Sequence, residues 1–265
     1  MQNFDSSQAI KESIEFLQKT FQKNNKQKAV ISVSGGIDSA VSLSLVTKAL
    51  GVENIFPVLL PYKDQDMSDA RDIIKWNNIP EENWLETNIQ PMVESFAKET
   101  NLLAITDDKY TQGKQDFIRL GNIMARTRMI LIFDLAKKLG ALVCGTENKS
   151  EKHLGYFTRF GDEAADVEPM FHLYKTQVRL IAETLELPVV FLQKAPTAGL
   201  WSNQTDENEL GFSYDIADAV MEEYFDQGKP ATDIYLEGIN KEMVQKVIQR
   251  IEVMKFKQVV PYSLD

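Results

Sequence analysis

The stretch SVSGGIDSA, at residues 32–40, constrains the fold more than any other part of this sequence. It follows KAVISV (28–33), a short run rich in β-branched residues, and leads into a segment with helical spacing that stops at Gly51. A strand, a tight glycine turn and a helix place the helix N-terminus at the carboxyl edge of a parallel sheet. Unpaired backbone N–H groups and the helix dipole favour an anion there, so the stretch predicts a phosphate-binding turn.

The alternation of strand and helix continues along the first half of the chain. Apolar periodicity predicts strands at 28–33, 54–61, 83–89 and 141–145, and helices around 10–21, 39–51, 66–78, 90–100 and 115–139. This order is typical of the α/β class, with a doubly wound, mostly parallel sheet and helices on both of its faces.

The second half of the chain is less regular. Helical spacing returns at 175–187, 215–228 and 240–256, whereas 146–168 and 193–211 show neither period and are predicted to be loops. Long irregular segments inside a domain are usually binding loops or lids. No repeat, linker or low-complexity tract divides the sequence, so we expect one domain over residues 1–265.

Charge and composition narrow the classes of function. A formal net charge of −10 disfavours nucleic acids and anionic membranes as partners. The sequence has no targeting segment and no apolar run long enough to span a membrane, so we expect a cytoplasmic protein. One cysteine, Cys144, and two histidines leave little for disulfides or zinc, and Cys144 falls in a predicted buried strand. Catalysis is therefore expected to use carboxylates, Lys, Arg, hydroxyls and backbone amides.

The residues of the glycine turn fit a bound phosphate. Gly35 and Gly36 allow the backbone to approach closely, and the Ser34 and Ser39 hydroxyls can add donors. Asp38 would repel a phosphate unless a cation lies between them, which predicts Mg²⁺. The turn has neither the lysine of the P-loop nor a G-x-G-x-x-G pattern. It does match S-G-G-x-D-S, the pyrophosphate loop of the N-type ATP pyrophosphatases, although a plain capped turn is the simpler alternative.

Five further stretches extend this resemblance over most of the chain. They are GNIMARTRM (121–129), GTENKSEKHLGYFTRFGDEAAD (145–166), KTQV (175–178), KAPTAGLW (194–201) and QTDENELGFSYD (204–215). Together with SGGIDSA they resemble the NAD synthetases. The resemblance implies an adenine nucleotide alpha hydrolase-like, Rossmann-like fold and the amidation of deamido-NAD to NAD with ATP and ammonia. It also implies an adenylated carboxylate intermediate, release of AMP and pyrophosphate, Mg²⁺, and a homodimer with the long helix at its interface.

The resemblance also assigns roles residue by residue. The expected catalytic residues are Asp38, Lys175 and Thr197; the expected ATP contacts are Ser34, Gly35, Gly36, Asp38, Ser39, Thr146, Lys175 and Thr197; the expected metal ligands are Asp38 and Glu151; and the expected contacts to deamido-NAD are Arg126, Arg159, Asp166 and Lys257. Two positions depart from the family. Arg159 is often lysine there, and Phe256 stands where many members have histidine, which leaves Lys257 as the substrate contact in that segment.

Several assignments have a simpler alternative. Arg119, Asn122 and Arg126 form one helical stripe that could be a solvated face. The acidic residues between Glu151 and Asp166 could be an exposed loop, although an acidic cluster opposite a phosphate turn favours metal binding. Lys175, in the first turn of its helix, opposes the helix dipole, which favours an anionic partner.

Ammonia is expected to be free, because no segment is left over for a glutamine-hydrolysing domain; delivery by a separate glutaminase is the alternative. Two other functions stay open at this point. One is another amidating or thiolating ATP pyrophosphatase, such as a GMP-synthetase-like or tRNA-modifying enzyme, and the other is a nucleotide-binding sensor without turnover.

Overall fold

A parallel sheet carries the glycine turn. In this computed structural model, which describes residues 4–102, 114–194, 205–259 and 261–262, the four strands have the order β3-β2-β1-β4. Their bounds are β1 (Ala29–Ser32), β2 (Ile55–Leu59), β3 (Leu85–Glu86) and β4 (Leu142–Cys144). Val30 of β1 lies opposite Phe56 on one side and Val143 on the other. From β1 the chain continues to β2 and β3 on one side of the sheet and then to β4 on the other side. The crevice outside the carboxyl ends of β1 and β4, where this order reverses, is the expected place for a ligand.

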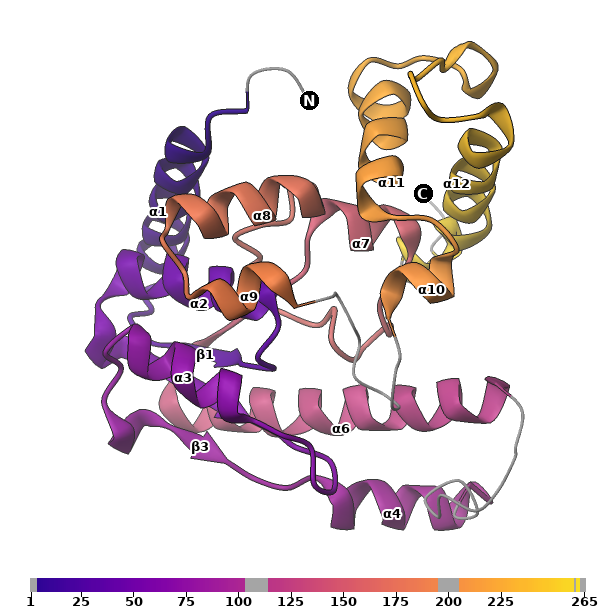
Figure 1. Cartoon of the computed structure of the whole chain (residues 1–265). Helices are drawn as coiled ribbons and strands as arrows, with labels where there is room; N and C mark the ends of the chain where they lie inside the picture. The colour runs from indigo at the N-terminus through magenta and orange to yellow at the C-terminus, as the bar shows by residue number, and fades with distance from the viewer. Residues whose placement is uncertain (1–3, 103–113, 195–204, 260, 263–265) are drawn as a thin grey trace.

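Helices cover both faces of this sheet, as Figure 1 shows. Within the described residues they are α1 (Ser6–Lys23), α2 (Ile37–Leu50), α3 (Ser68–Trp76), α4 (Gln90–Glu99), α6 (Lys114–Leu139), α7 (Lys149–Leu154), α8 (Lys175–Thr184), α9 (Val189–Gln193), α10 (Asp206–Leu210), α11 (Tyr214–Met221) and α12 (Lys241–Met254). Short turns of 3-10 helix occupy Val52–Asn54, Glu81–Asn83, Ala231–Asp233 and Lys255–Lys257, and a π-helical turn, Glu222–Asp226, follows α11.

The strands alternate between two apolar cores. Ala29 and Ile31 of β1 join the core with α1, α2 and α8, whereas Val30 joins the core with α4 and α6. Successive side chains of a strand point to opposite faces, so a strand that is covered on both faces is apolar at every position. This is the reason why KAVISV predicted a buried parallel strand, and the predicted fold class is confirmed.

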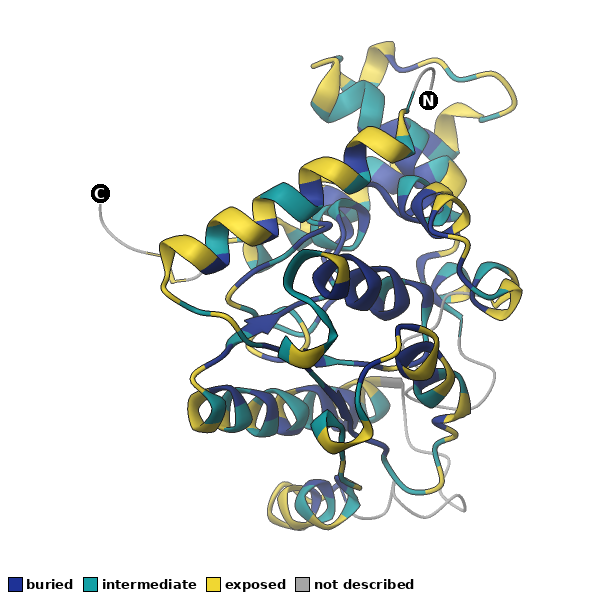
Figure 2. Cartoon of the chain, turned by 90° about the vertical axis from the view of Figure 1, so that its left-hand side faces the viewer, coloured by how far each residue is buried: buried dark blue, intermediate teal, exposed yellow. Residues whose placement is uncertain are grey.

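Helix α2 is buried on all sides. Its residues from Ser39 to Thr47 are buried, and Gly51 ends it with a φ of 86°. Figure 2 shows dark blue, buried segments in the middle of the molecule and yellow, exposed residues on the outer faces of the surrounding helices. A helix held on every side fixes its own N-terminus, and that end carries the glycine turn.

A third apolar cluster lies beyond the sheet. Residues of α7, α11 and α12 pack around Tyr214 and Val247. Helices α11 and α12 stand apart from the sheet, at the upper right of Figure 1. Helix α7 lies inside the predicted loop 146–168, and α10 lies inside the predicted loop 193–211, so the loop prediction is wrong at these two places. Both are short helices begun by a side-chain cap, at Asn148 and Thr205, and are too short to show a period.

The described part of the chain contains no helix that is long and apolar enough to cross a membrane.

Candidate active site

The glycine turn opens the N-terminus of α2 toward the crevice. Gly35 has a φ of +81°, and a Cβ there would lie 3.1 Å from the backbone nitrogen of Ala70, so glycine is required by both conformation and space. Gly36 begins the helix without a side-chain cap. The amide of Gly36 donates to Ser34 Oγ (3.3 Å), which lies 3.2 Å from Ser39 Oγ. Ser39 Oγ donates to the carbonyl of Gly36 (2.9 Å), so these hydrogen bonds fix the turn at the end of the helix where an anion is favoured.

A buried lysine joins two carboxylates beside this turn. Lys175 Nζ lies 2.5 Å from Asp38 Oδ2 and 2.9 Å from Glu151 Oε1, and the lysine is only 2% exposed. Sequence reasoning named all three residues but not their contact. Burial lowers the pKa of Lys175, but the two carboxylates outweigh burial and the net pKa is raised. Lys175 therefore stays protonated, whereas burial raises the pKa of the Glu151 carboxyl to about 8 although Lys175 lies beside it.

Three polar residues that the sequence did not single out hold this group in place. Asn148 donates from Nδ2 to Asp38 Oδ1 (2.9 Å), and its Oδ1 caps α7 by accepting from the amide of Glu151 (3.0 Å). The amide of Lys175 donates to Ser150 Oγ (2.8 Å), which in turn donates to the fully buried Asp218 (2.5 Å). The Asn148-x-x-Glu151 spacing is that of a helix start, and it was the signal available in the sequence.

The same group fits a magnesium ion. Carboxylate oxygen is the ligand that Mg²⁺ prefers, and Mg²⁺ usually takes one or two carboxylates from the protein and its other ligands from phosphate and water. Asp38 and Glu151 meet at a single ammonium and supply two such oxygens. Within the described residues no group of three or more His, Cys, Asp or Glu side chains is placed to hold a metal by itself. A metal here would therefore depend on the substrate's phosphates.

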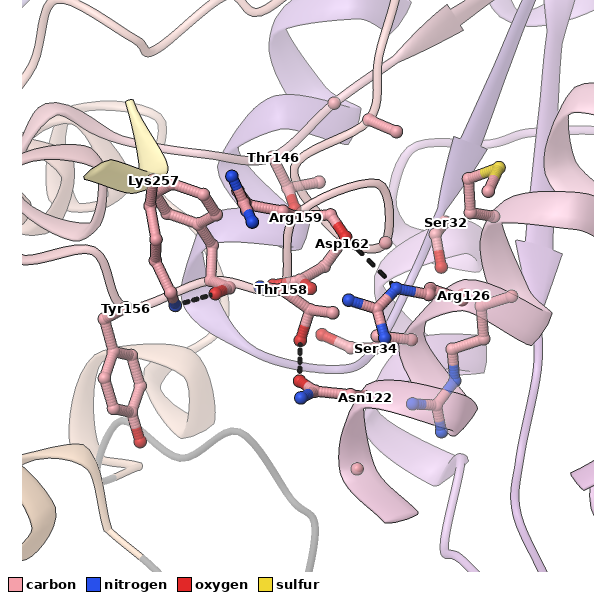
Figure 3. A pocket seen from close by; sticks show the side chains of 18 of the residues that line it. Ser32, Ser34, Asn122, Arg126, Thr146, Tyr156, Thr158, Arg159, Asp162 and Lys257 are labelled. Atoms are coloured by element: carbon pink, nitrogen blue, oxygen red, sulfur yellow. Dashed lines mark hydrogen bonds between the residues drawn. The ribbon is translucent and has the colours of Figure 1, made fainter. Parts of the chain in front are cut away.

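A cavity of about 770 Å³ begins at the turn and extends past β4 toward α12. Ser34 and Thr146 line it where β1 and β4 end, and Arg126, Arg159 and Lys257 line it farther on, as Figure 3 shows. Five predicted site residues from four separate parts of the chain thus face one cavity. The positive charges of the three basic residues on this side of the cavity suit a ligand with phosphate groups.

The polar stripe of α6 is divided by the fold. Asn122 accepts from Thr158 Oγ1 (2.8 Å), and Arg126 Nε donates to the carbonyl of Arg159 (3.2 Å), so both connect α6 to the loop after α7. Arg119 instead pairs with Asp116 (2.8 Å) away from the cavity. The solvated-face alternative therefore holds for Arg119 and fails for Asn122, which lines the cavity.

The C-terminal segment closes one end of the cavity. Lys257 Nζ donates to the carbonyls of Gly155 (2.7 Å) and Phe157, and burial lowers its pKa. The guanidinium carbon of Arg159 lies 5.4 Å from the centre of the Phe256 ring. Phe256 therefore contacts the cation next to it in the cavity, although it cannot donate a hydrogen bond as a histidine would.

The acidic residues of the loop 155–168 do not form a metal cluster. Asp162 accepts from the amide of Thr158 (2.9 Å), and Glu163 accepts from that of Phe160 (3.3 Å). Asp166 accepts from the amide of Val143 (2.8 Å), is exposed, and is not among the cavity residues. The interpretation of Glu151, Asp162, Glu163 and Asp166 as one metal cluster is wrong, because no three such side chains in the described residues are placed to hold a metal, and the last three each accept from a backbone amide instead.

Thr197 lies outside the described residues, so its predicted role stays a prediction. Cys144 is buried, as expected, and burial raises the pKa of its thiol to about 12, which excludes a ready thiolate. Arg128 is a cavity residue that sequence reasoning missed. It donates to Leu60 O (3.0 Å) and Gln65 Oε1 (3.1 Å), and in the described part of the chain it has no carboxylate partner. Burial lowers its pKa to about 10, which leaves the guanidinium charged at neutral pH.

Comparison with known proteins agrees with this geometry. A family model described as NAD synthase matches residues 9–261. The chain belongs to this family. The NH(3)-dependent NAD(+) synthetase of Thermococcus kodakarensis is 40% identical over 263 residues, and that of Thermoplasma acidophilum is 39% identical over 260 residues; each alignment covers 98% of both chains. Among solved structures, NMN synthetase from Francisella tularensis aligns with a TM-score of 0.82 and 31% identity, over 99% of this chain and 100% of that one.

Proposed function

We propose that the chain catalyses the ATP-dependent amidation of deamido-NAD to NAD with ammonia. The observation that carries this function is the position of the Asp38–Lys175–Glu151 group beside the phosphate-binding turn, whose Ser34 lines a cavity with basic side chains. Relatives that span the whole chain are named for this reaction. The GMP-synthetase-like, tRNA-modifying and sensor alternatives have no such support.

The carboxylate of deamido-NAD is a poor electrophile and has to be activated. Its oxygen attacks the α-phosphorus of ATP, pyrophosphate leaves, and the product is a mixed anhydride with AMP. Ammonia then attacks the carbonyl carbon and loses a proton, and AMP leaves. In this scheme Ser34, Gly35, Gly36 and Ser39 hold the pyrophosphate at the N-terminus of α2, and in the free protein the two hydroxyls and the Gly36 amide hydrogen-bond to one another within the turn.

Lys175 and the predicted metal ligands act on charge. Lys175 holds Asp38 and Glu151 together, so their carboxyl oxygens are in position for a cation next to the phosphates. When bound there, Mg²⁺ supplies positive charge for the phosphate oxygens and for the pyrophosphate as it leaves. Asp38 and Glu151 would be its protein ligands.

The remaining predicted residues bind the two nucleotides. Thr146 follows β4 and lines the cavity, as Ser34 does. Thr146 and Thr197 are both assigned to ATP. Arg126, Arg159 and Lys257 provide cations for the phosphates and carboxylate of deamido-NAD. Asp166 is assigned to the same substrate by resemblance, but its contact with Val143 also gives it a role in shaping the end of β4.

We further propose a cytoplasmic homodimer whose protomer is a single domain. Ile130 is an exposed apolar residue on the long helix α6, which supports an interface on that helix. Light scattering of the protein and of Ile130→Glu tests this directly, because a charge at the centre of the interface should convert dimer to monomer.

A second candidate substrate is nicotinic acid mononucleotide. The observation that favours it is the likeness to the Francisella tularensis NMN synthetase, which is similar over the full length of both chains. The same turn and activation chemistry serve either acid, because both carry the same pyridine carboxylate. The two candidate substrates differ only in the second nucleotide, so only the part of the cavity that would hold this nucleotide distinguishes them.

The test measures NAD and pyrophosphate together. Purified protein receives ATP, Mg²⁺, an ammonium salt and deamido-NAD, and a parallel reaction contains the mononucleotide acid instead. We expect equal amounts of NAD and pyrophosphate, both lost in Asp38→Ala. A higher kcat/KM for the mononucleotide would assign the second candidate, and pyrophosphate without either amide would reject the amidation.

A further inference from the structure

A second pair of carboxylates, Glu147 and Glu168, lies near the carboxyl end of β4 and does not belong to the group around Lys175. Glu147 and Glu168 are held together, because the amide of Glu147 donates to Glu168 Oε2 (3.1 Å). Glu147 is 5% exposed. Neither residue has a role in the function described above.

Each member of this pair has a buried oxygen without a donor. Glu147 Oε2 and Glu168 Oε1 are out of contact with water and have no hydrogen-bond partner within the described residues. Buried polar atoms are nearly always paired, and an unpaired one costs about 1–3 kcal/mol or more when it is charged. The charged groups that act most strongly on Glu147 are all carboxylates: Glu151, Asp162, Glu168 and Asp38. This surrounding favours the uptake of a proton or of another cation.

The pair is close to the cavity wall. Gly145 and Thr146 line the cavity, and a Cβ on Gly145 would fall on the carboxylate of Glu168. The Glu168 carboxylate therefore packs directly against the backbone that separates it from the cavity. The charge of Glu147 acts to raise the pKa of Lys257, but Lys257 Nζ already donates to two backbone carbonyls.

We propose that Glu147 and Glu168 form a binding site for ammonium and supply the nucleophile to the cavity across the Gly145–Thr146 wall. The inference rests on the proposed function, in which ammonia attacks the activated carboxylate. Ammonium is small, carries one positive charge and has only donors, whereas ionised carboxylates have only acceptors. A divalent ion would need more oxygen ligands than this pair provides.

The same pair can release the neutral nucleophile. Transfer of one proton from bound ammonium to a carboxylate leaves ammonia and one neutral carboxyl group. Burial, together with the neighbouring negative charges, raises the pKa of both Glu147 and Glu168 well above the ordinary value, so each accepts a proton readily.

The test separates ammonium binding from the rest of the reaction. Initial rates of NAD formation are measured against ammonium chloride at saturating ATP, Mg²⁺ and deamido-NAD, for the wild type, Glu147→Gln and Glu168→Gln. Removing one charged acceptor should raise the KM for ammonium about 10- to 100-fold. The KM values for ATP and deamido-NAD, and the ATP–pyrophosphate exchange without ammonium, should stay unchanged.

Glu163→Gln is the matched control, because this carboxylate belongs to the same loop as Glu168 and also accepts from a backbone amide, but has no buried oxygen without a partner. An unchanged KM for ammonium in both variants would overturn the inference, as would an equal loss of ATP–pyrophosphate exchange, which indicates a structural role. Activation of the wild type by potassium at fixed ammonium would also overturn it, because the pair would then hold an alkali cation. If the wild type makes no NAD at any ammonium concentration, the proposed function itself fails.

Discussion

Two pairs of largely buried carboxylates, Asp38 with Glu151 and Glu147 with Glu168, differ in what neutralises them. Asp38 and Glu151 share the ammonium of Lys175, whereas Glu147 and Glu168 face no cation that bonds to them within the described residues. A buried charge with a partner can be close to neutral in its effect on stability, and a buried charge without one is costly. The first pair is therefore neutralised by a cation of the protein itself, and the second is the pair for which we propose ammonium.

The largest expected effect comes from removing the cation of the first pair. Lys175→Met leaves Asp38 and Glu151 unpaired, so it should lower the free energy of unfolding at pH 8 by about 3–5 kcal/mol. NAD formation should fall about 1000-fold, because the charge that organises the phosphate site is lost. Urea unfolding and initial rates measure the two effects. The stability deficit should shrink toward pH 5 as the unpaired carboxyls take up protons.

Lys149→Met is the control for this prediction. Lys149 also forms an ion pair, with Asp226 (2.5 Å), but its partner is largely exposed to water. A pair of this kind contributes about 0–1 kcal/mol. If the two variants lose the same stability, the buried group around Lys175 is not special and the comparison breaks.

The next largest effect is expected for Asp38→Asn, which should reduce catalysis more than stability. Asp38→Asn leaves Lys175 paired with Glu151, so we expect a smaller loss of stability than in Lys175→Met. Loss of the carboxylate should still lower kcat by about 100- to 1000-fold and raise the Mg²⁺ concentration needed for half-maximal rate. Asp116→Asn, which breaks an exposed pair with Arg119, should change neither. A normal Mg²⁺ requirement in Asp38→Asn would reject the proposed metal ligand.

For the second pair the expected change in stability has the opposite sign. The folded-state pKa of Glu168 is raised above about 4.5, so the folded protein binds more protons than the unfolded one above that pH. Stability is then lost as pH rises, and Glu168→Gln removes this loss. The variant should be more stable than the wild type by about 1–4 kcal/mol at pH 8, and the difference should shrink toward pH 5.

Thermal unfolding at the two pH values measures this gain. Glu99→Gln, an exposed carboxylate at the end of α4, is the control and should leave the melting temperature unchanged at both. A destabilised Glu168→Gln at pH 8 would mean that the pair has a donor or cation in the free protein, and the contrast between the two pairs would be lost.

The same contrast explains how much of the molecule could be predicted from the sequence. The sheet and the glycine turn depend on local patterns: buried strands apolar at every position, and a turn that only glycine can make. Asp38, Glu151 and Lys175 were named from separate motifs, but their meeting at one ammonium depends on how α2, α7 and α8 pack together.

What could not be predicted depends on tertiary contacts. The pair of Glu147 and Glu168 exists because Gly145 has no side chain and lets a carboxylate pack against the backbone. Asp166 looked like part of an acidic cluster, yet a single backbone amide of β4 accounts for its carboxylate. An acidic residue in a loop has the same sequence signal whether it binds a metal, caps an amide or has no partner.

The smallest expected effect concerns a charge whose partner is only an aromatic ring. Arg159 lies over Phe256, which is 46% exposed, and a cation–π contact at such a site contributes about 0.5–1 kcal/mol. Phe256→Ala should therefore raise the KM for deamido-NAD about 2- to 5-fold and leave kcat unchanged, because the ring positions Arg159 without touching the reacting atoms. Phe256→Tyr keeps the ring and should restore the KM. An effect as large as that of Asp38→Asn would show that the ring contacts the substrate itself, and this end of the cavity would then belong with the reacting groups.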